Sequence, residues 1–202
     1  MDFGTFVLKQ LPPPPRRVLE VGAGDKGGVV ELLRNAGYDA IGVDPVAPEG
    51  PHFRQVEFQD VEGEWDAVVA GRVLHHVHPL GEGIAKLASL APLVIVDEFA
   101  PDRIDAAAQD WYEGQYRMLA AAGAPPDAPE SLDAWRERTR DIHPHDVLLA
   151  ALRAHYEELV LEWGPYLHRW LRGPSSEALE QTLVDMGAIP AIGYRWVGRR
   201  IR

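Results

Sequence analysis

Short apolar runs alternate with helical patterns along most of this chain. Each run is short enough for a buried strand, and apolar positions at helical spacing follow several of them. For example, Ile84, Leu87 and Leu90 share one face of a helix predicted over residues 80–90. Such alternation favours a parallel sheet with helices on both faces. The seven predicted strands are Val18–Val21, Ala40–Val43, Arg54–Phe58, Trp65–Ala70, Leu93–Asp97, Glu158–Trp163 and Ile192–Val197, and a further helix is predicted over 175–186.

The first predicted strand ends in a glycine-rich turn over residues 22–28. Glycine permits a tight turn and lets a ligand lie against bare peptide groups. A helix follows at once, with an apolar face over residues 29–33 and Gly37 at its C-cap. Asp44 ends the second strand about 20 residues beyond the glycines, where a carboxylate is expected to accept ribose hydroxyls. The pattern therefore predicts a nucleotide-like cofactor at the carboxyl edge of the sheet.

Residues 101–171 differ from the rest because they hold many of the aromatic side chains. A Gly- and Pro-rich break over residues 123–129 divides them into helical pieces. We interpret residues 101–156 as a helical lid inserted after strand five. The alternative that the aromatic residues fill the core behind the sheet stays open. The candidates to contact a substrate are Trp111, Tyr112 and Tyr116.

Composition restricts the function classes. The 202 residues, 46% hydrophobic and 25% charged, fit one domain over residues 1–202. Residues 1–16 are a Pro-rich lead-in, in which Pro12–Pro15 are predicted to form a stiff polyproline II segment. No apolar run approaches the ~20 residues that span a bilayer, so we predict no membrane partner. The sequence has no cysteine and no signal-peptide pattern at its N-terminus, and we therefore predict a cytoplasmic protein. A net charge of −11 argues against a nucleic-acid partner, because nucleic-acid binding relies on basic surface. No sequence pattern indicates an oligomeric state. We interpret Arg195, Arg199, Arg200 and Arg202 as a solvated last strand and tail.

Four segments follow one another in a distinctive order: Val18–Gly24, Gly42–Pro45, Phe58–Val61 and Trp65–Val77. Together they resemble the motifs of class I S-adenosylmethionine-dependent methyltransferases, in particular the broad methyltransferase type 11 group. The resemblance runs from about residue 17 to residue 200. It implies an α/β, Rossmann-like fold, with a seven-stranded, mostly parallel sheet. The family usually has a third glycine where this chain has Lys26, which predicts either a loop lengthened by one residue or a weakened cofactor site.

The resemblance implies that the cofactor is S-adenosylmethionine. Gly22, Ala23 and Gly24 would pack their backbone against its methionine and ribose parts. Glu20 would orient the loop and hold the ammonium group, and Asp44 would accept the ribose hydroxyls. Asp60 would accept from the adenine amino group, and the Gly71 carbonyl would lie near the ammonium. The full predicted cofactor set is Glu20, Gly22, Ala23, Gly24, Asp44, Pro45, Asp60, Val61, Gly71 and Arg72.

Methyl transfer from a sulfonium requires an aligned acceptor, and it requires a base only where the acceptor must lose a proton. We predict His75, His76 and His143 as catalytic candidates; Glu98 and His145 are further possible bases. The alternatives are that the histidine pair fixes its loop and that residues 143–146 cap a helix. The spacing of His75, His76 and His78 does not suit three ligands on one helical face, so no metal is predicted.

The predicted function is methyl transfer to a small-molecule acceptor through an undetermined O, N or C atom. An NAD(P)-dependent oxidoreductase is the second hypothesis, because residues 22–27 match G-x-G-x-x-G with Asp44 downstream. Glu20 within strand one argues against it, as does the absence of a tyrosine followed four residues later by lysine. A non-catalytic regulatory protein that binds S-adenosylmethionine is the third hypothesis.

Overall fold

The computed structural model describes residues 1–171 and 174–201, except for the side chains of residues 174 and 175. The chain forms two compact units. The first comprises Met1–Glu98, Asp146–Leu161 and Arg195–Arg202, and the second comprises Phe99–His145 and Glu162–Tyr194. The second unit therefore does not coincide with the predicted insertion, because α7 (His168–Leu171) packs against both α8 (Pro174–Asp185) and α4 (Ala106–Ala121).

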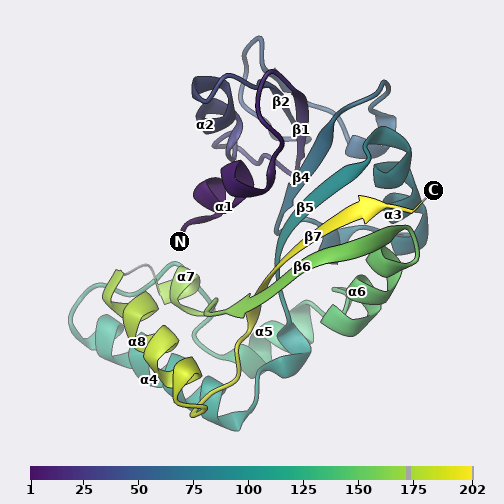
Figure 1. Cartoon of the computed structure of the whole chain (residues 1–202). Helices are drawn as coiled ribbons and strands as arrows, with labels where there is room; N and C mark the ends of the chain where they lie inside the picture. Colours follow the sequence, from purple (N-terminus) through teal and green to yellow (C-terminus); the bar gives the residue numbers. More distant parts are fainter. Residues whose placement is uncertain (172–173, 202) are drawn as a thin grey trace. The chain divides into compact units, whose positions relative to one another are not determined.

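A seven-stranded sheet has the order β3-β2-β1-β4-β5-β7-β6. The pairs β1–β2, β1–β4, β2–β3 and β4–β5 are parallel, whereas β6 and β7 run in opposite directions (Figure 1). The predicted fold class is thus confirmed. The strands are β1 (Arg17–Val21), β2 (Asp39–Val43), β3 (Phe53–Arg54), β4 (Ala67–Gly71), β5 (Leu93–Phe99), β6 (Tyr156–Gly164) and β7 (Gly193–Arg200). The remaining elements are α1 (Phe3–Gln10), α2 (Val30–Asn35), α3 (Leu80–Leu90), α5 (Leu132–Arg138) and α6 (His145–Arg153), with 3₁₀ turns η1 (Phe58–Asp60), η2 (Leu74–His76) and η3 (Pro101–Arg103).

The third strand is much shorter than predicted. Pairing with β2 involves only Phe53 and Arg54, and the chain then leaves the sheet. Residues 54–58 do alternate, but Val56 is 36% exposed whereas Phe58 is 5% exposed, so the two apolar side chains do not form one buried strand face. Phe58 instead begins the turn η1.

The N-terminal segment contains a helix that was not predicted, and its proline run differs from the predicted polyproline II segment. Residues 3–10 form α1, whose N-cap is Asp2, and the chain bends at residues 13–15 rather than staying extended. Phe3, Phe6 and Val7 recur at helical spacing, and Phe6 and Val7 are completely buried. This periodicity was available in the sequence, but the neighbouring prolines obscured it.

The core of the first unit packs α1 and α2 onto the sheet, with Phe6, Val18, Leu33 and Val69 fully buried. The predicted face of α3 is buried, which confirms that helix. Two expectations were wrong. Leu32, predicted on the buried face of α2, is 41% exposed. Arg195 is not solvated: its Nε lies 3.2 Å from Asp97 Oδ1, and its side chain is only 17% exposed.

Aromatic side chains form much of the core of the second unit. Phe99 stacks on Tyr166 with ring centroids 4.6 Å apart, and the Trp135 and Trp170 rings lie 5.0 Å apart. The Glu180 carboxylate, also fully buried, accepts backbone N–H bonds from Tyr166, Leu167 and His168. These bonds satisfy backbone donors at the start of α7, which otherwise lack partners within the helix.

The parallel register brings four strand ends to one edge of the first unit. Val21 pairs with both Val43 and Ala70, and Gly71 pairs with Asp97. The loops after β1, β2 and β4 therefore begin side by side, together with the end of β5. Ligands of open α/β sheets bind at such an edge, which makes it the candidate site of this chain.

Candidate functional site

The glycine loop after β1 is held in conformations that suit glycine. Gly22, Gly24 and Gly27 have φ of 75°, 62° and 78°, in the left-handed region. A Cβ on Gly22 would lie 2.6 Å from Val73 Cβ, so glycine lets this loop approach the one after β4. A Cβ on Gly24 would meet no atom within 4 Å, so the space beside this residue is open to a ligand.

Asp44 joins the first two strand ends. Its Oδ2 accepts the Gly24 N–H over 3.0 Å, and its Oδ1 accepts the Val46 N–H over 2.9 Å. The residue is half-buried. Because each carboxylate oxygen has a second lone pair, Asp44 can still accept further donors such as hydroxyls. Pro45 lies beside it and is exposed.

Glu20 lies beneath the glycine loop. Its side chain projects from β1 and is 3% exposed, and Oε2 accepts the Val29 N–H over 2.7 Å. A Cβ on Gly28 would collide with the Glu20 carboxylate. Burial raises the pKa of Glu20 from 4.5 to about 7, against the opposing effect of the Val29 hydrogen bond. These contacts agree with the prediction that Glu20 orients the glycine loop.

The remaining predicted cofactor residues differ in exposure. Asp60 is exposed in η1, whereas the neighbouring Val61 is 3% exposed. Lys26 is also exposed, and the following Gly27 packs on the Phe53 ring, since a Cβ there would lie 2.7 Å from it. The exposed Lys26 side chain favours a lengthened glycine loop over an intruding lysine.

The loop after β4 begins with an unusual backbone conformation. Arg72 has φ of 57°, which is uncommon for a residue with a side chain, and its N–H donates to the Asp97 carbonyl over 2.7 Å. The Phe3 ring of α1 lies against Gly71, where a Cβ would be 3.1 Å from it. Phe3 thus contacts the predicted site, and sequence reasoning missed it because α1 was not predicted.

A buried carboxylate fixes the histidine turn η2. Glu98 is fully buried, and its Oε1 accepts the Leu74 N–H over 2.8 Å. Its Oε2 lies 2.8 Å from Nδ1 of His75, which is itself 6% exposed. Because a carboxylate accepts hydrogen bonds, this contact places the ring proton of neutral His75 on Nδ1. Glu98, considered as a base from the sequence, therefore holds the turn.

The other predicted residues belong to both units. His76 is exposed, with its ring centroid 4.1 Å from that of His75, and His143 belongs to the second unit and is half-buried. Tyr112 is fully buried, and its hydroxyl donates to the Pro129 carbonyl over 2.6 Å. Burial raises its pKa. Trp111 and Tyr116 are half-buried and pack on the same core cluster.

Comparison with known proteins shows which family the chain belongs to. Residues 2–145 match the profile of the methyltransferase domain family, which is more than half of the chain. The chain belongs to this family. The class-level prediction of an S-adenosylmethionine-dependent methyltransferase is confirmed, whereas the type 11 subgroup stays a prediction. The match also decides against the oxidoreductase hypothesis.

Solved structures share the fold of this methyltransferase across nearly its whole length. A putative methyltransferase from an antibiotic biosynthesis pathway of Anabaena variabilis has a TM-score of 0.62 at 14% identity, covering 98% of this chain and 96% of that one. A putative S-adenosylmethionine-dependent methyltransferase from Listeria monocytogenes has 0.60 at 12%, covering 98% and 97%. Magnesium protoporphyrin IX methyltransferase from Synechocystis, with bound S-adenosylhomocysteine, has 0.56 at 16%, covering 98% and 80%. At these identities the likeness establishes the fold alone.

Two further searches gave negative results for this methyltransferase. A search of curated proteins gave no match. Among the described residues, none of the helices has both the length and the apolar character required to cross a bilayer.

Proposed function

We propose that this methyltransferase transfers a methyl group from S-adenosylmethionine to a small-molecule acceptor. The observation that carries the proposal is the joint placement of the open space at Gly24 and the half-buried Asp44 carboxylate at one sheet edge. Open space beside a carboxylate fits a ribose that donates hydroxyl hydrogen bonds.

The proposal assigns roles to the residues around that edge. Gly22–Gly24 give the cofactor close access to the backbone, Asp44 accepts the ribose hydroxyls, and Asp60 with Val61 receives the adenine. Glu20 holds the loop from beneath, and Gly71 with Arg72 bounds the methionine end. Pro45 closes the turn after Asp44. The carboxylates also suit a cofactor that carries positive charge.

The cofactor supplies a methyl group on a positively charged sulfur, which is already activated toward a nucleophile. The protein's task is then to orient the acceptor and exclude water rather than to activate the methyl carbon. Within the first unit, the contacts of Glu98 favour a positioning role for His75. His76 and His143 stay predicted participants without a contact that assigns their task.

The acceptor class rests on surface charge and on the second unit. A net charge of −11 disfavours a nucleic-acid acceptor, and the aromatic side chains favour an apolar or aromatic molecule. Trp111 and Tyr116 stay candidates for contact with it, whereas the buried contacts of Tyr112 favour a core role. The lid formed by residues 101–156 likewise stays a prediction.

Transfer of an isotopic label tests the proposal. The protein is incubated with methyl-labelled S-adenosylmethionine and, in separate reactions, a metabolite extract, total tRNA and a protein mixture. We expect label in the metabolite fraction only. Label in tRNA or protein would contradict the small-molecule acceptor, and cofactor binding without transfer to any fraction would favour the regulatory alternative.

A further inference from the structure

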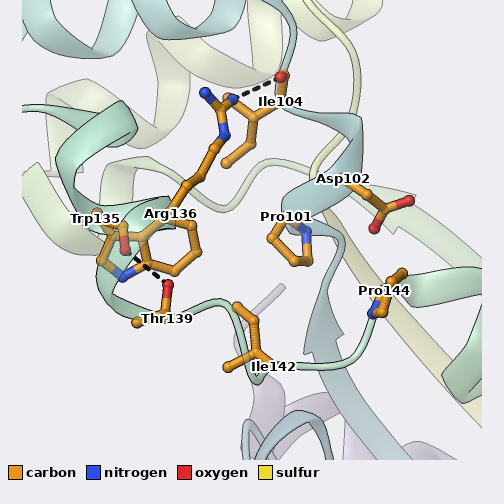
Figure 2. Close-up of a pocket in the computed structure, with 8 residues that line it drawn as sticks. All are labelled: Pro101, Asp102, Ile104, Trp135, Arg136, Thr139, Ile142 and Pro144. Carbon is orange, nitrogen blue, oxygen red and sulfur yellow. Dashed lines mark hydrogen bonds between the residues drawn. The ribbon is translucent and has the colours of Figure 1, made fainter.

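A pocket of about 330 Å³ lies within the second unit, and its charged side chains already have partners. Arg136 in its wall donates to the Ile104 carbonyl over 2.7 Å (Figure 2) and to Asp133 over 2.8 Å. Asp102 also lines the pocket, and its two oxygens lie 3.0 Å from the backbone nitrogen and 2.6 Å from Nδ1 of His145. Both charged groups therefore have hydrogen-bond partners within the protein, and a more consequential arrangement lies in the first unit.

The Phe53 ring occupies a space that three glycines leave open. A Cβ on Gly27 would lie 2.7 Å from Phe53 Cζ, and one on Gly42 would lie 3.0 Å from Cδ1. A Cβ on Gly50 would lie 3.7 Å from Cδ2, which is an ordinary contact distance. A larger residue at Gly27 or Gly42 would crowd the ring, so these glycines let Phe53 pack against both the loop after β1 and the strand β2.

Backbone pairing of β3 with β2 holds Phe53 in this position. Phe53 pairs with Gly42 in the parallel register. On one side of it, the Gly42 N–H donates to the His52 carbonyl over 2.9 Å. On the other side, the Asp44 N–H donates to the Arg54 carbonyl over 3.2 Å. The short strand β3 therefore fixes the backbone of Phe53 to the strand that ends at Asp44.

The ring contact bears on where the lengthened glycine loop lies. Gly27 is buried against Phe53, whereas the preceding Lys26 is exposed. The Gly27 N–H donates to the Gly24 carbonyl over 3.3 Å, and the Gly24 N–H in turn donates to Asp44 over 3.0 Å. Phe53 is thus connected through Gly27 to the part of the loop that Asp44 binds.

We propose that Phe53 is a positioning residue of the cofactor site. Its ring supports Gly27 and thereby keeps Gly24 and Asp44 together for the ribose, in a loop that is one residue longer at Lys26. An aromatic ring suits this task, because it fills a large volume with few side-chain torsions to order. The inference rests on the proposed methyltransferase function, and it gives β3 the task of supporting the loop.

Titration calorimetry with S-adenosylmethionine tests this role. Phe53→Ala should weaken binding about tenfold, because the loop loses its support and is less preorganised. Phe53→Leu keeps part of the apolar contact and should lose less. The matched control is Leu93→Ala, since Leu93 is also partly buried against the same core cluster but begins β5, at the opposite edge of the sheet from the loop. This control should lower the melting temperature without changing the affinity, and an equal change in affinity in Phe53→Ala and Leu93→Ala would overturn the role.

A double-mutant cycle with Gly27→Ala separates the ring contact from general destabilisation. In the wild-type background the added Cβ would collide with the Phe53 ring, whereas in Phe53→Ala that ring is absent. The strain of a Cβ at the Gly27 φ of 78° is common to both backgrounds and cancels. We therefore expect Gly27→Ala to weaken S-adenosylmethionine binding several-fold more in the wild-type background than in Phe53→Ala. Equal weakening in the two backgrounds would contradict the proposal.

Hydrogen exchange of the Gly24 amide reports on the loop without a ligand. In Phe53→Ala this amide should exchange faster than global unfolding of the same variant allows, whereas in Leu93→Ala it should follow global stability. If the wild-type protein binds no S-adenosylmethionine, the proposed function fails, and faster Gly24 exchange in Phe53→Ala still supports positioning of the loop. If S-adenosylmethionine binds but neither its affinity nor Gly24 exchange responds specifically to Phe53→Ala, the positioning role fails and the proposed function stands.

Discussion

The Asp44 carboxylate accepts the Gly24 N–H over 3.0 Å, joining the end of β2 to the glycine loop after β1. One side chain thereby orders the loop and presents a carboxylate beside the open space at Gly24. The cofactor site thus depends on Asp44 both for its shape and for its hydrogen-bonding capacity.

Replacement of Asp44 should weaken cofactor binding. We expect Asp44→Ala to reduce the affinity for S-adenosylmethionine by roughly 1–3 kcal/mol, because it removes a charged acceptor. Asp44→Asn should have a smaller effect, since an amide oxygen can still accept the Gly24 N–H. Titration calorimetry measures both variants. The control is Asp39→Ala at the opposite end of β2, whose side chain is 62% exposed; an Asp44→Ala affinity equal to that of this control would remove Asp44 from the site.

A side chain at Gly22 should block the cofactor site. Gly22→Val adds bulk where even a Cβ would be 2.6 Å from Val73, at a φ of 75° that disfavours valine. We expect loss of detectable S-adenosylmethionine binding and a lowered melting temperature. Gly81→Ala is the control, because a Cβ there meets nothing within 4 Å. Normal binding by folded Gly22→Val protein would contradict the assignment of the loop.

Glu98 should be important for stability through the turn η2. Glu98→Ala leaves the Leu74 N–H and His75 Nδ1 without their buried partner, at an expected cost of about 1–3 kcal/mol for each unsatisfied donor. Glu98→Gln keeps an acceptor and should cost less. Urea unfolding measures the change, with exposed Glu157→Ala as the control. If Glu98→Ala matched Glu157→Ala, the carboxylate would have no role in holding the turn.

Glu20 should make stability depend on pH. Its folded pKa of about 7 lies above the ordinary 4.5, so between these values the folded state binds a proton that the unfolded state has lost. The resulting stabilisation is present at the lower pH and is lost as the pH rises through about 7, by at most about 3 kcal/mol. Glu20→Gln should flatten this part of the unfolding free energy against pH. An unchanged slope in the variant would show that Glu20 is not the titrating group.

Sequence patterns were sufficient for most of the sheet and for the edge at which the glycine loop and Asp44 lie. Buried strands such as β4 are continuous apolar runs, and parallel strands bring their carboxyl ends to one edge, so both segments were predicted there. The edge strand β3 was overpredicted because alternation in residues 54–58 does not reveal whether a neighbouring strand or core is available to bury Val56.

Contacts between distant residues were much less accessible to sequence reasoning. Nothing local indicates that Glu98 binds a histidine 23 residues earlier, or that Asp102 binds His145. The aromatic residues were ambiguous for a similar reason: Tyr112 and Trp111 are adjacent, yet only Tyr112 is fully buried. Burial of a helical side chain depends on which helices pack around it, and residues far along the chain decide that.

Calorimetric titration with S-adenosylmethionine, S-adenosylhomocysteine and NAD(H), side by side, tests the central claim most directly. The account predicts micromolar binding of the first two and none of the third, with loss of binding in Gly22→Val. Binding of NAD(H) alone, or of none of the three, would contradict it.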